Sequence, residues 1–114
     1  MPRFAKSKYS NIQTQIDGIK FDSRKEAKRY MELSLMLKAG IIKDLQLQPR
    51  FVILDGYTKG SRKVKAIEYV ADFKYWDNEK QQWIIEDVKG LKTQVYQLKK
   101  KMFEARYTEM ITEV

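Results

Sequence analysis

Two strand-like segments separated by a short polar turn restrict this chain to folds that contain an antiparallel hairpin. In residues 65–76 ("KAIEYVADFKYW") every second residue from Ile67 to Tyr75 is apolar or aromatic, a period that predicts a strand with one buried face. Residues 82–89 ("QWIIEDVK") form the second segment, and the polar residues 77–81 between them predict the turn. We therefore expect these two strands to pair.

Local signals upstream of this hairpin predict an arm, a smaller hairpin and a helix. Residues 1–12 ("MPRFAKSKYSNI") contain basic residues and no acid, which suggests a flexible basic arm before a single domain, 13–114. Asp17-Gly18 between short alternating runs predicts a tight turn, preferably type I′. Ser23 is a suitable N-cap for a helix that Gly40 would end.

The remaining pattern adds a strand at residues 50–55 and a final helix from Thr93, its predicted N-cap, to Met110. The apolar stripe of this helix is predicted from residues at helical spacing: Val95, Leu98, Met102 and Ala105. The expected fold class is α/β or α+β, with a mainly antiparallel sheet of three to four strands flanked by helices.

Composition limits the chemistry that the chain can perform. The 114 residues include 23 Lys and Arg against 15 Asp and Glu, a net charge of +8 that favours a polyanionic partner such as nucleic acid. Without cysteine or histidine, thiolate metal sites, histidine-ligated zinc and the serine–histidine triad are excluded. The lack of cysteine is compatible with a cytoplasmic location. No apolar run approaches the roughly 18 residues of a membrane span, so no membrane partner is predicted.

Carboxylates concentrate where the two hairpin strands would meet. The strand period places Asp87 and Lys89 on one face of segment 82–89, and Asp72 interrupts an otherwise apolar stretch of segment 65–76. If the strands pair, Asp72 and Asp87 approach each other, and two close carboxylates repel unless a cation lies between them. Glu86, on the opposite face, is expected to be solvated.

These residues resemble the PD-(D/E)XK nuclease superfamily: an acid in "VADF" (Asp72), then Asp87-Val88-Lys89 in "EDVKG". Glu26 in "FDSRKEAKRY" stands where that superfamily often has a helical glutamate. Over roughly residues 14–107 the chain is similar to a small phage-encoded group of uncharacterised function, to endonuclease I type Holliday-junction resolvases and to the TnsA-type transposase nuclease. It departs from the motif in having alanine rather than proline before Asp72, and the second acid is aspartate, with Glu86 as the alternative.

The resemblance implies a restriction-endonuclease-like core and a Mg²⁺- or Mn²⁺-dependent phosphodiester hydrolase. Asp72, Asp87 and the Val88 carbonyl would hold the ion, Glu26 would hold a second ion or its water, and Lys89 would orient the attacking water or stabilise the transition state. It further implies a structure-directed DNA endonuclease, acting on branched DNA such as Holliday junctions in phage recombination or repair. Its location would be the cytoplasm of a phage-infected or prophage-bearing bacterium, and a homodimer would suit cutting of two strands.

Each assignment has a structural alternative. Ser23 and Glu26 also fit a capping box, Asp72 could simply pair with Lys74, and Asp87 with Lys89 could be an ordinary ion pair. Two acid-free basic runs are either solvated faces or contacts to DNA phosphates: Lys59, Arg62, Lys63 and Lys65 in the first, and Lys92, Lys99, Lys100 and Lys101 in the second.

The aromatic residues of the last helix (Tyr96, Phe103 and Tyr107) are expected to pack in the core or at a dimer interface rather than stack on bases. Two competing functional classes remain: a non-catalytic nucleic-acid-binding protein with the same fold, and a structural phage component in which the acids and the lysine coincide by chance.

Overall fold

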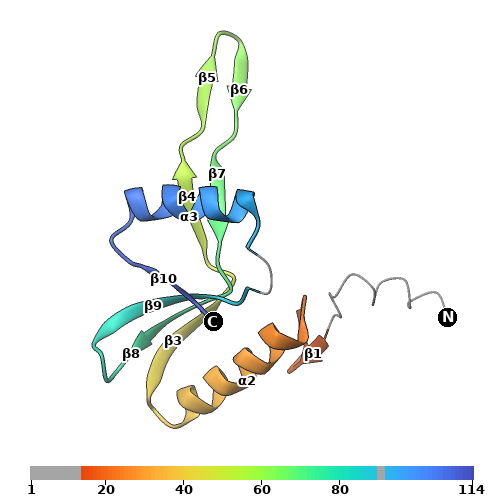
Figure 1. The fold of residues 1–114 in the computed structure, drawn as a ribbon, viewed down its shortest axis with the longest axis vertical. Coiled ribbons are helices and arrows are strands. Elements are labelled where there is room, and N and C mark those ends of the chain that lie inside the picture. Colours follow the sequence, from red (N-terminus) through yellow and green to blue (C-terminus); the bar gives the residue numbers. More distant parts are fainter. Residues whose placement is uncertain (1–13, 90–91) are drawn as a thin grey trace, which may run out of the picture. The chain divides into compact units, whose positions relative to one another are not determined.

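The computed structural model describes residues 14–89 and 92–114 and has a mixed α+β structure with two helices and several antiparallel sheets (Figure 1). Its contacts divide the chain between Ile41 and Ile42 into two units. The predicted basic arm, residues 1–12, lies outside the described residues. Within the described part of the chain, no helix has the length and apolar character needed to cross a membrane.

The N-terminal unit contains the hairpin that Asp17-Gly18 predicts. Strands β1 (Thr14–Ile16) and β2 (Ile19–Phe21) pair antiparallel. Asp17 and Gly18 have φ values of 53° and 76°, and positive φ at both central residues is the signature of a type I′ turn. This prediction is confirmed.

Helix α2 (Arg24–Lys38) follows, with both ends as predicted. The Ser23 side chain accepts a hydrogen bond from the Glu26 backbone N–H at 3.1 Å, so Ser23 is the N-cap. Gly40, at φ 76°, takes the left-handed conformation that commonly ends helices. Ala27 and Leu33 are buried, so they belong to the face that the helix turns to the protein interior.

A four-stranded sheet is the centre of the C-terminal unit, in the order β10-β9-β8-β3. Its strands are β3 (Ile42–Leu47), β8 (Phe73–Asp77), β9 (Gln82–Asp87) and β10 (Ile111–Glu113). The predicted β8–β9 hairpin is confirmed, and its facing Trp76 and Trp83 rings lie 5.4 Å apart in an edge-to-face arrangement. Strand β10 pairs parallel to β9. The sequence pattern predicted neither β3 nor β10.

The segment predicted as one strand over residues 65–76 is two strands, so that prediction is wrong. Strand β7 (Ile67–Val70) pairs with β4 (Arg50–Leu54), while β8 pairs with β9 and β3. The break falls at Ala71-Asp72: the Ala71 N–H bonds to the Pro49 carbonyl (3.1 Å) and the Asp72 N–H bonds to the Glu86 carbonyl (3.1 Å). Ala71 is therefore hydrogen-bonded to the segment before β4, and Asp72 is hydrogen-bonded to β9. Between these two residues the chain passes from the β4–β7 sheet to the four-stranded sheet.

The basic connection between β4 and β7 is itself a hairpin. Strands β5 (Tyr57–Lys59) and β6 (Arg62–Val64) pair antiparallel around Gly60-Ser61. Gly60 has φ 61°, as expected for glycine at the first central position of a type II′ turn. We call residues 57–64 the basic ribbon.

Helix α3 (Gln94–Arg106) begins as predicted, with the Thr93 side chain accepting from the Tyr96 N–H at 3.1 Å. The predicted apolar stripe is wrong for Val95 and Leu98, which are 63% and 60% exposed, whereas its member Met102 packs against the core. The buried residues of the helix are Tyr96 and Phe103. The helix packs on β4 and β7, and the aromatic face fits there because Phe51 and Tyr69 contact Phe103 at centroid distances of 5.1 and 5.6 Å.

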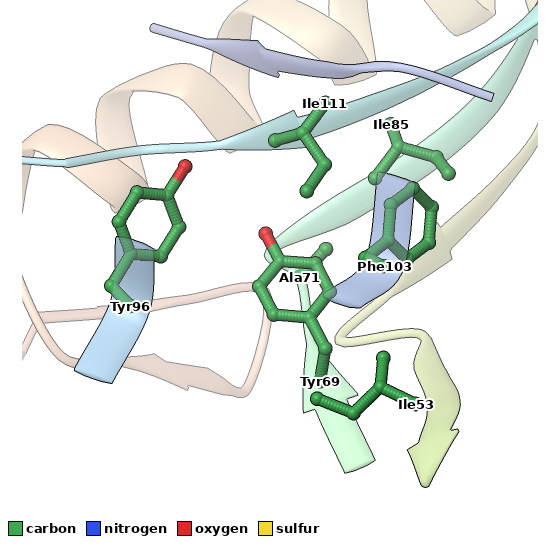
Figure 2. Close-up of a cluster of buried hydrophobic side chains, with 7 residues drawn as sticks. All are labelled: Ile53, Tyr69, Ala71, Ile85, Tyr96, Phe103 and Ile111. Atoms are coloured by element: carbon green, nitrogen blue, oxygen red, sulfur yellow. The ribbon is translucent and has the colours of Figure 1, made fainter. Parts of the chain in front are cut away.

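The core of the C-terminal unit lies between this helix and the strands (Figure 2). Its buried side chains come from β4, β7, β9, α3, β10 and the β7–β8 break: Ile53, Tyr69, Ala71, Ile85, Tyr96, Phe103 and Ile111. Tyr96 and Phe103 therefore pack in the core, as predicted, and Tyr107 packs against it. In Figure 2 the Tyr69 and Tyr96 hydroxyl groups point towards the same side of the cluster, and they donate hydrogen bonds to Asp87 and Glu113, respectively.

Candidate functional site

Asp72 and Asp87 lie at the same end of the β8–β9 hairpin. The register ends with the pair Phe73 and Glu86, Asp72 directly precedes β8, and Asp87 is the last residue of β9. The Val88 N–H donates to Asp72 Oδ2 at 2.6 Å, and the Asp72 N–H bonds to the Glu86 carbonyl. The hairpin thus brings the first acid of the motif against the backbone of the D-x-K segment.

Gln48-Pro49 fixes Asp72 from the other side. The Gln48 N–H donates to the Asp72 carbonyl at 2.9 Å, and the Pro49 carbonyl accepts from Ala71. Gln48 has φ 51°, a left-handed conformation that costs a non-glycine residue about 1–3 kcal/mol and persists only where its surroundings impose it. No sequence pattern links this dipeptide to the acids, because the contact joins residues 24 positions apart.

Asp87 is a buried carboxylate whose two oxygens have different surroundings. Its side chain is 1% exposed, and Oδ2 accepts a hydrogen bond from the Tyr69 hydroxyl. Lys89 Nζ lies 3.0 Å from Oδ1, yet no hydrogen bond with suitable geometry reaches this oxygen within the described residues. The predicted common face of Asp87 and Lys89 agrees with this ion pair, and Oδ1 keeps unused capacity to accept from a ligand.

Glu86 is also buried, so the expectation that it is solvated is wrong. The residue is 1% exposed, and the Tyr75 hydroxyl donates to Oε2. Successive strand residues point to opposite faces, so Glu86 and Asp87 use different tyrosines. The reason for the burial is that Tyr75 of β8, also buried, supplies a donor where water had been expected.

Lys89 is held by a second contact, to an aromatic ring. Its Nζ lies 4.5 Å from the centroid of the Tyr96 ring, a cation–π distance. The Tyr96 hydroxyl in turn donates to Glu113 Oε2 at 2.7 Å. Helix α3 and strand β10 therefore position the lysine of the motif.

The two tyrosines of this site remain protonated donors at neutral pH. Burial is the main cause that raises the pKa of the Tyr69 hydroxyl well above its usual value, followed by its hydrogen bond to Asp87. Burial likewise raises the pKa of Tyr96, helped by the bond to Glu113. Tyr69 and Tyr75 are not among the predicted site residues; their only sequence signal is that a buried tyrosine hydroxyl needs an acceptor, which the acids of β9 supply.

The second basic run is partly neutralised by Glu113. Lys92 and Lys100 lie 2.9 and 3.3 Å from its carboxylate. Lys92, then Tyr96, lower the pKa of Glu113 from 4.5 to about 2. Lys99 donates to the Glu68 carbonyl at 3.1 Å, whereas Lys101 is exposed. The run lacks acids in sequence, but the fold supplies one from β10.

The first basic run has different surroundings. Its four members are exposed, and no ion pair involves any of them in the part of the chain that the structure describes: Lys59, Arg62, Lys63 and Lys65.

Lys74, the alternative ion-pair partner of Asp72, lies over two aromatic rings. Its Nζ is 4.9 Å from the centroid of the Trp83 ring and 5.7 Å from that of the Phe51 ring.

Glu26 belongs to the N-terminal unit, in the first turn of α2, where it is buried. Its backbone bond to Ser23 is one half of the predicted capping box. A role for Glu26 beside Asp72 and Asp87 stays a prediction.

Oxygen donors for a cation are present at the end of β9, although residues 14–89 and 92–114 contain no group of three or more acidic side chains arranged for a metal. Two of these donors are the carboxylates of Asp72 and Asp87, which lie at the same end of the hairpin. The third is the carbonyl of Val88, the residue between Asp87 and Lys89, whose N–H bonds to Asp72. Hard oxygen atoms of this kind suit Mg²⁺ or Mn²⁺, which usually keep several waters and need few protein ligands.

The fold and site define an α+β protein with buried acids and a lysine gathered at a strand end. The chain belongs to the DUF1064 family, described as a protein of unknown function, whose model matches residues 6–114. Neither the curated proteins nor the solved structures include a match to the chain.

Proposed function

We propose that this protein is a metal-dependent DNA endonuclease with a PD-(D/E)XK-type site on a restriction-endonuclease-like core. The observation that carries the proposal is that Asp72 Oδ2 accepts a hydrogen bond from the Val88 N–H at 2.6 Å, while Lys89 Nζ lies 3.0 Å from Asp87 Oδ1. Two acids and a lysine at the end of a hairpin are the arrangement that such a motif requires. The fold supports the proposal because Asp72 directly precedes β8 and Asp87 ends its partner strand β9.

A divalent ion would be held by Asp72, Asp87 and the Val88 carbonyl, with Glu26 as a further predicted ligand. The buried Asp87 Oδ1 supports this assignment: Lys89 Nζ lies 3.0 Å from it, but it accepts no hydrogen bond of suitable geometry among the described residues, so it retains capacity to accept from a ligand. When bound, such an ion supplies positive charge to a phosphoryl oxygen and makes water more acidic.

Neighbouring side chains orient the proposed catalytic groups Asp87 and Lys89. The protonated Tyr69 hydroxyl donates to Asp87 Oδ2, which keeps that carboxylate oriented. Lys89, held between Asp87 and the Tyr96 ring, can orient a water or stabilise negative charge on a phosphate. Lysine takes this role in a chain that contains no histidine.

The proposed substrate is DNA, branched junctions included, because the chain has a net charge of +8 and an exposed basic ribbon in the unit that carries the acids. A role in phage recombination or repair in the bacterial cytoplasm, and a homodimer that cuts two strands, complete the proposal. The competing proposal is a DNA-binding protein without catalysis. It assigns the same DNA contacts to the basic ribbon but gives Asp72, Asp87 and Lys89 no catalytic role.

Cleavage assays with supercoiled plasmid and a four-way junction test the proposal. The wild-type chain should cut DNA with Mg²⁺ or Mn²⁺ and stop when chelator is added, whereas Ca²⁺ should support binding better than cutting. Asp72→Asn should lower the rate by about a thousandfold, equivalent to about 4 kcal/mol of transition-state stabilisation. Asp44→Asn is the matched control, because Asp44 is an exposed residue of β3 at φ 55°, a conformation that asparagine tolerates.

DNA binding without any metal-dependent cutting would overturn the nuclease proposal in favour of the non-catalytic one. Equal activity of Asp72→Asn and Asp44→Asn would remove Asp72 from the site. Glu26→Gln separates catalysis from capping, because glutamine can still complete a capping box. Lost cutting with an unchanged melting temperature would place Glu26 in catalysis, and full activity would leave it as a helix cap.

A further inference from the structure

The basic ribbon is an extension of the sheet that adds nothing to the core. It continues beyond β4 and β7, past helix α3 (Figure 1). Every residue of the ribbon except Val64 is exposed, including Tyr57 at 48%. A two-stranded hairpin of this kind is only marginally stable in water, so its retention is not explained by burial.

The charges of the ribbon work against its own stability. Residues 57–65 contain Lys59, Arg62, Lys63 and Lys65 and no acid. The register places Lys59 directly opposite Arg62, next to the turn, and like charges in that position destabilise a hairpin. A polyanion close to the tip would remove this repulsion.

The two faces of the ribbon differ. Tyr57 pairs with Val64 and Lys59 pairs with Arg62, and residues two apart on a strand share a face. One face therefore has two cations near the tip and an exposed aromatic ring near the base. Such a face offers charge for phosphates and an apolar surface for sugars or base edges.

The base of the ribbon is held more firmly than its tip. A Cβ atom at Gly56 would lie 3.0 Å from the Val64 carbonyl oxygen and 3.1 Å from the Ala66 nitrogen, so the two segments lie so close here that a side chain would require the backbone to shift. Asp55, the preceding residue, forms an ion pair with Arg106 of α3 at 2.9 Å. These contacts set the direction in which the ribbon leaves the sheet.

We infer that the basic ribbon enters the major groove of duplex DNA with its Lys59–Arg62 tip. A two-stranded ribbon, with strands about 4.8 Å apart, fits the major groove, which is about 12 Å wide, better than the minor groove of about 6 Å. The inference takes only the partner, DNA, from the proposed function. It concerns how the duplex is held and requires no cutting.

Charge reversal at the tip gives opposite effects on stability and binding. Lys59→Glu places an acid opposite Arg62, so the urea midpoint should stay constant or rise. The Kd for a short duplex, measured by mobility shift in chelator, should rise at least tenfold or so, with a smaller salt slope. Lys80→Glu makes the same charge change at an exposed turn between β8 and β9 and should change Kd by less than about threefold.

The groove is tested by crosslinking. The chain contains no cysteine, so Ser61→Cys adds a single thiol at the tip of the ribbon, and Lys80→Cys is its control. Duplexes carry a mixed disulfide tethered either to cytosine N4, in the major groove, or to guanine N2, in the minor groove. Ser61→Cys should capture the major-groove tether at least several times faster than the other, and Lys80→Cys should capture neither above background.

The outcomes separate this inference from the proposed function. Equal affinities of Lys59→Glu and Lys80→Glu, or equal capture of both tethers by Ser61→Cys, would overturn the ribbon inference while metal-dependent cutting could persist. Selective major-groove capture by a chain that never cuts DNA would support the ribbon inference and overturn the nuclease.

Discussion

Strand β9 ends in two neighbouring acids that resemble each other in burial but not in surroundings. Glu86 and Asp87 are each 1% exposed, and each accepts a hydrogen bond from a tyrosine hydroxyl. Asp87, however, lies beside Lys89 and next to Val88, whose N–H bonds to Asp72, whereas Glu86 points to the other face. The comparison teaches that burial alone does not distinguish the two carboxylates; the nearby second acid and the cation do.

The largest expected difference is in catalysis. Asp87→Asn should reduce the rate of metal-dependent cutting by about a thousandfold, because amide oxygen is a weaker ligand without charge. Glu86→Gln, which makes the same chemical change one residue away, should keep the rate within about tenfold. Cutting rates on plasmid DNA at saturating Mg²⁺ measure both. A greater loss in Glu86→Gln would exchange the roles of the two acids.

A smaller difference is expected in stability when each tyrosine hydroxyl is removed. Tyr69→Phe and Tyr75→Phe should each lower the free energy of unfolding by about 1.5–3 kcal/mol, because a buried carboxylate loses a donor. Millimolar Mg²⁺ should stabilise both variants by binding to the folded state, but less in Tyr69→Phe, where Asp87 has lost the donor that orients it. Urea unfolding followed by circular dichroism, with and without Mg²⁺, provides the measurement. Equal stabilisation of both variants by Mg²⁺ would contradict a cation site that depends on the Asp87 carboxylate oriented by Tyr69.

The smallest effect concerns Glu113, which stands opposite Asp87 in the β9–β10 register but is charge-paired with lysines. Its pKa is lowered to about 2, first by Lys92, so its contribution to stability is complete above pH 4.5 and is lost as the pH falls through 2. Wild type should therefore exceed Glu113→Gln in urea midpoint at neutral pH, with the gap closing below pH 4.5. A gap that widens in acid would contradict this assignment.

Much of the local structure could be predicted because local chemistry decides it. Asp17-Gly18 tolerates the positive φ values of its turn, and the side chains of Ser23 and Thr93 accept from their own helices. The β8–β9 pairing followed from alternation and a polar turn, and it brought Asp72 to Asp87. These features depend on residues close in sequence.

The features that were missed depend on residues far apart in sequence. The alternating pattern runs unbroken through Ala71-Asp72, and only the bonds to Pro49 and Glu86 show that the strand changes sheets there. On α3, Val95 and Tyr96 begin two competing stripes, and the aromatic surface of β4 and β7 decides between them. Glu86 was expected in water because Tyr75, which binds it, lies on another strand.

The paired indole rings of Trp76 and Trp83 offer a spectroscopic consequence. They are the two tryptophans of the whole chain, and they face each other across β8 and β9. Fluorescence emission excited near the red edge of indole absorption therefore reports this hairpin, which carries Glu86 and Asp87, and contains no signal from the basic ribbon. Their edge-to-face contact at 5.4 Å also couples their electronic transitions, so an exciton band in the circular dichroism spectrum should disappear when this hairpin opens, even while α3 remains helical.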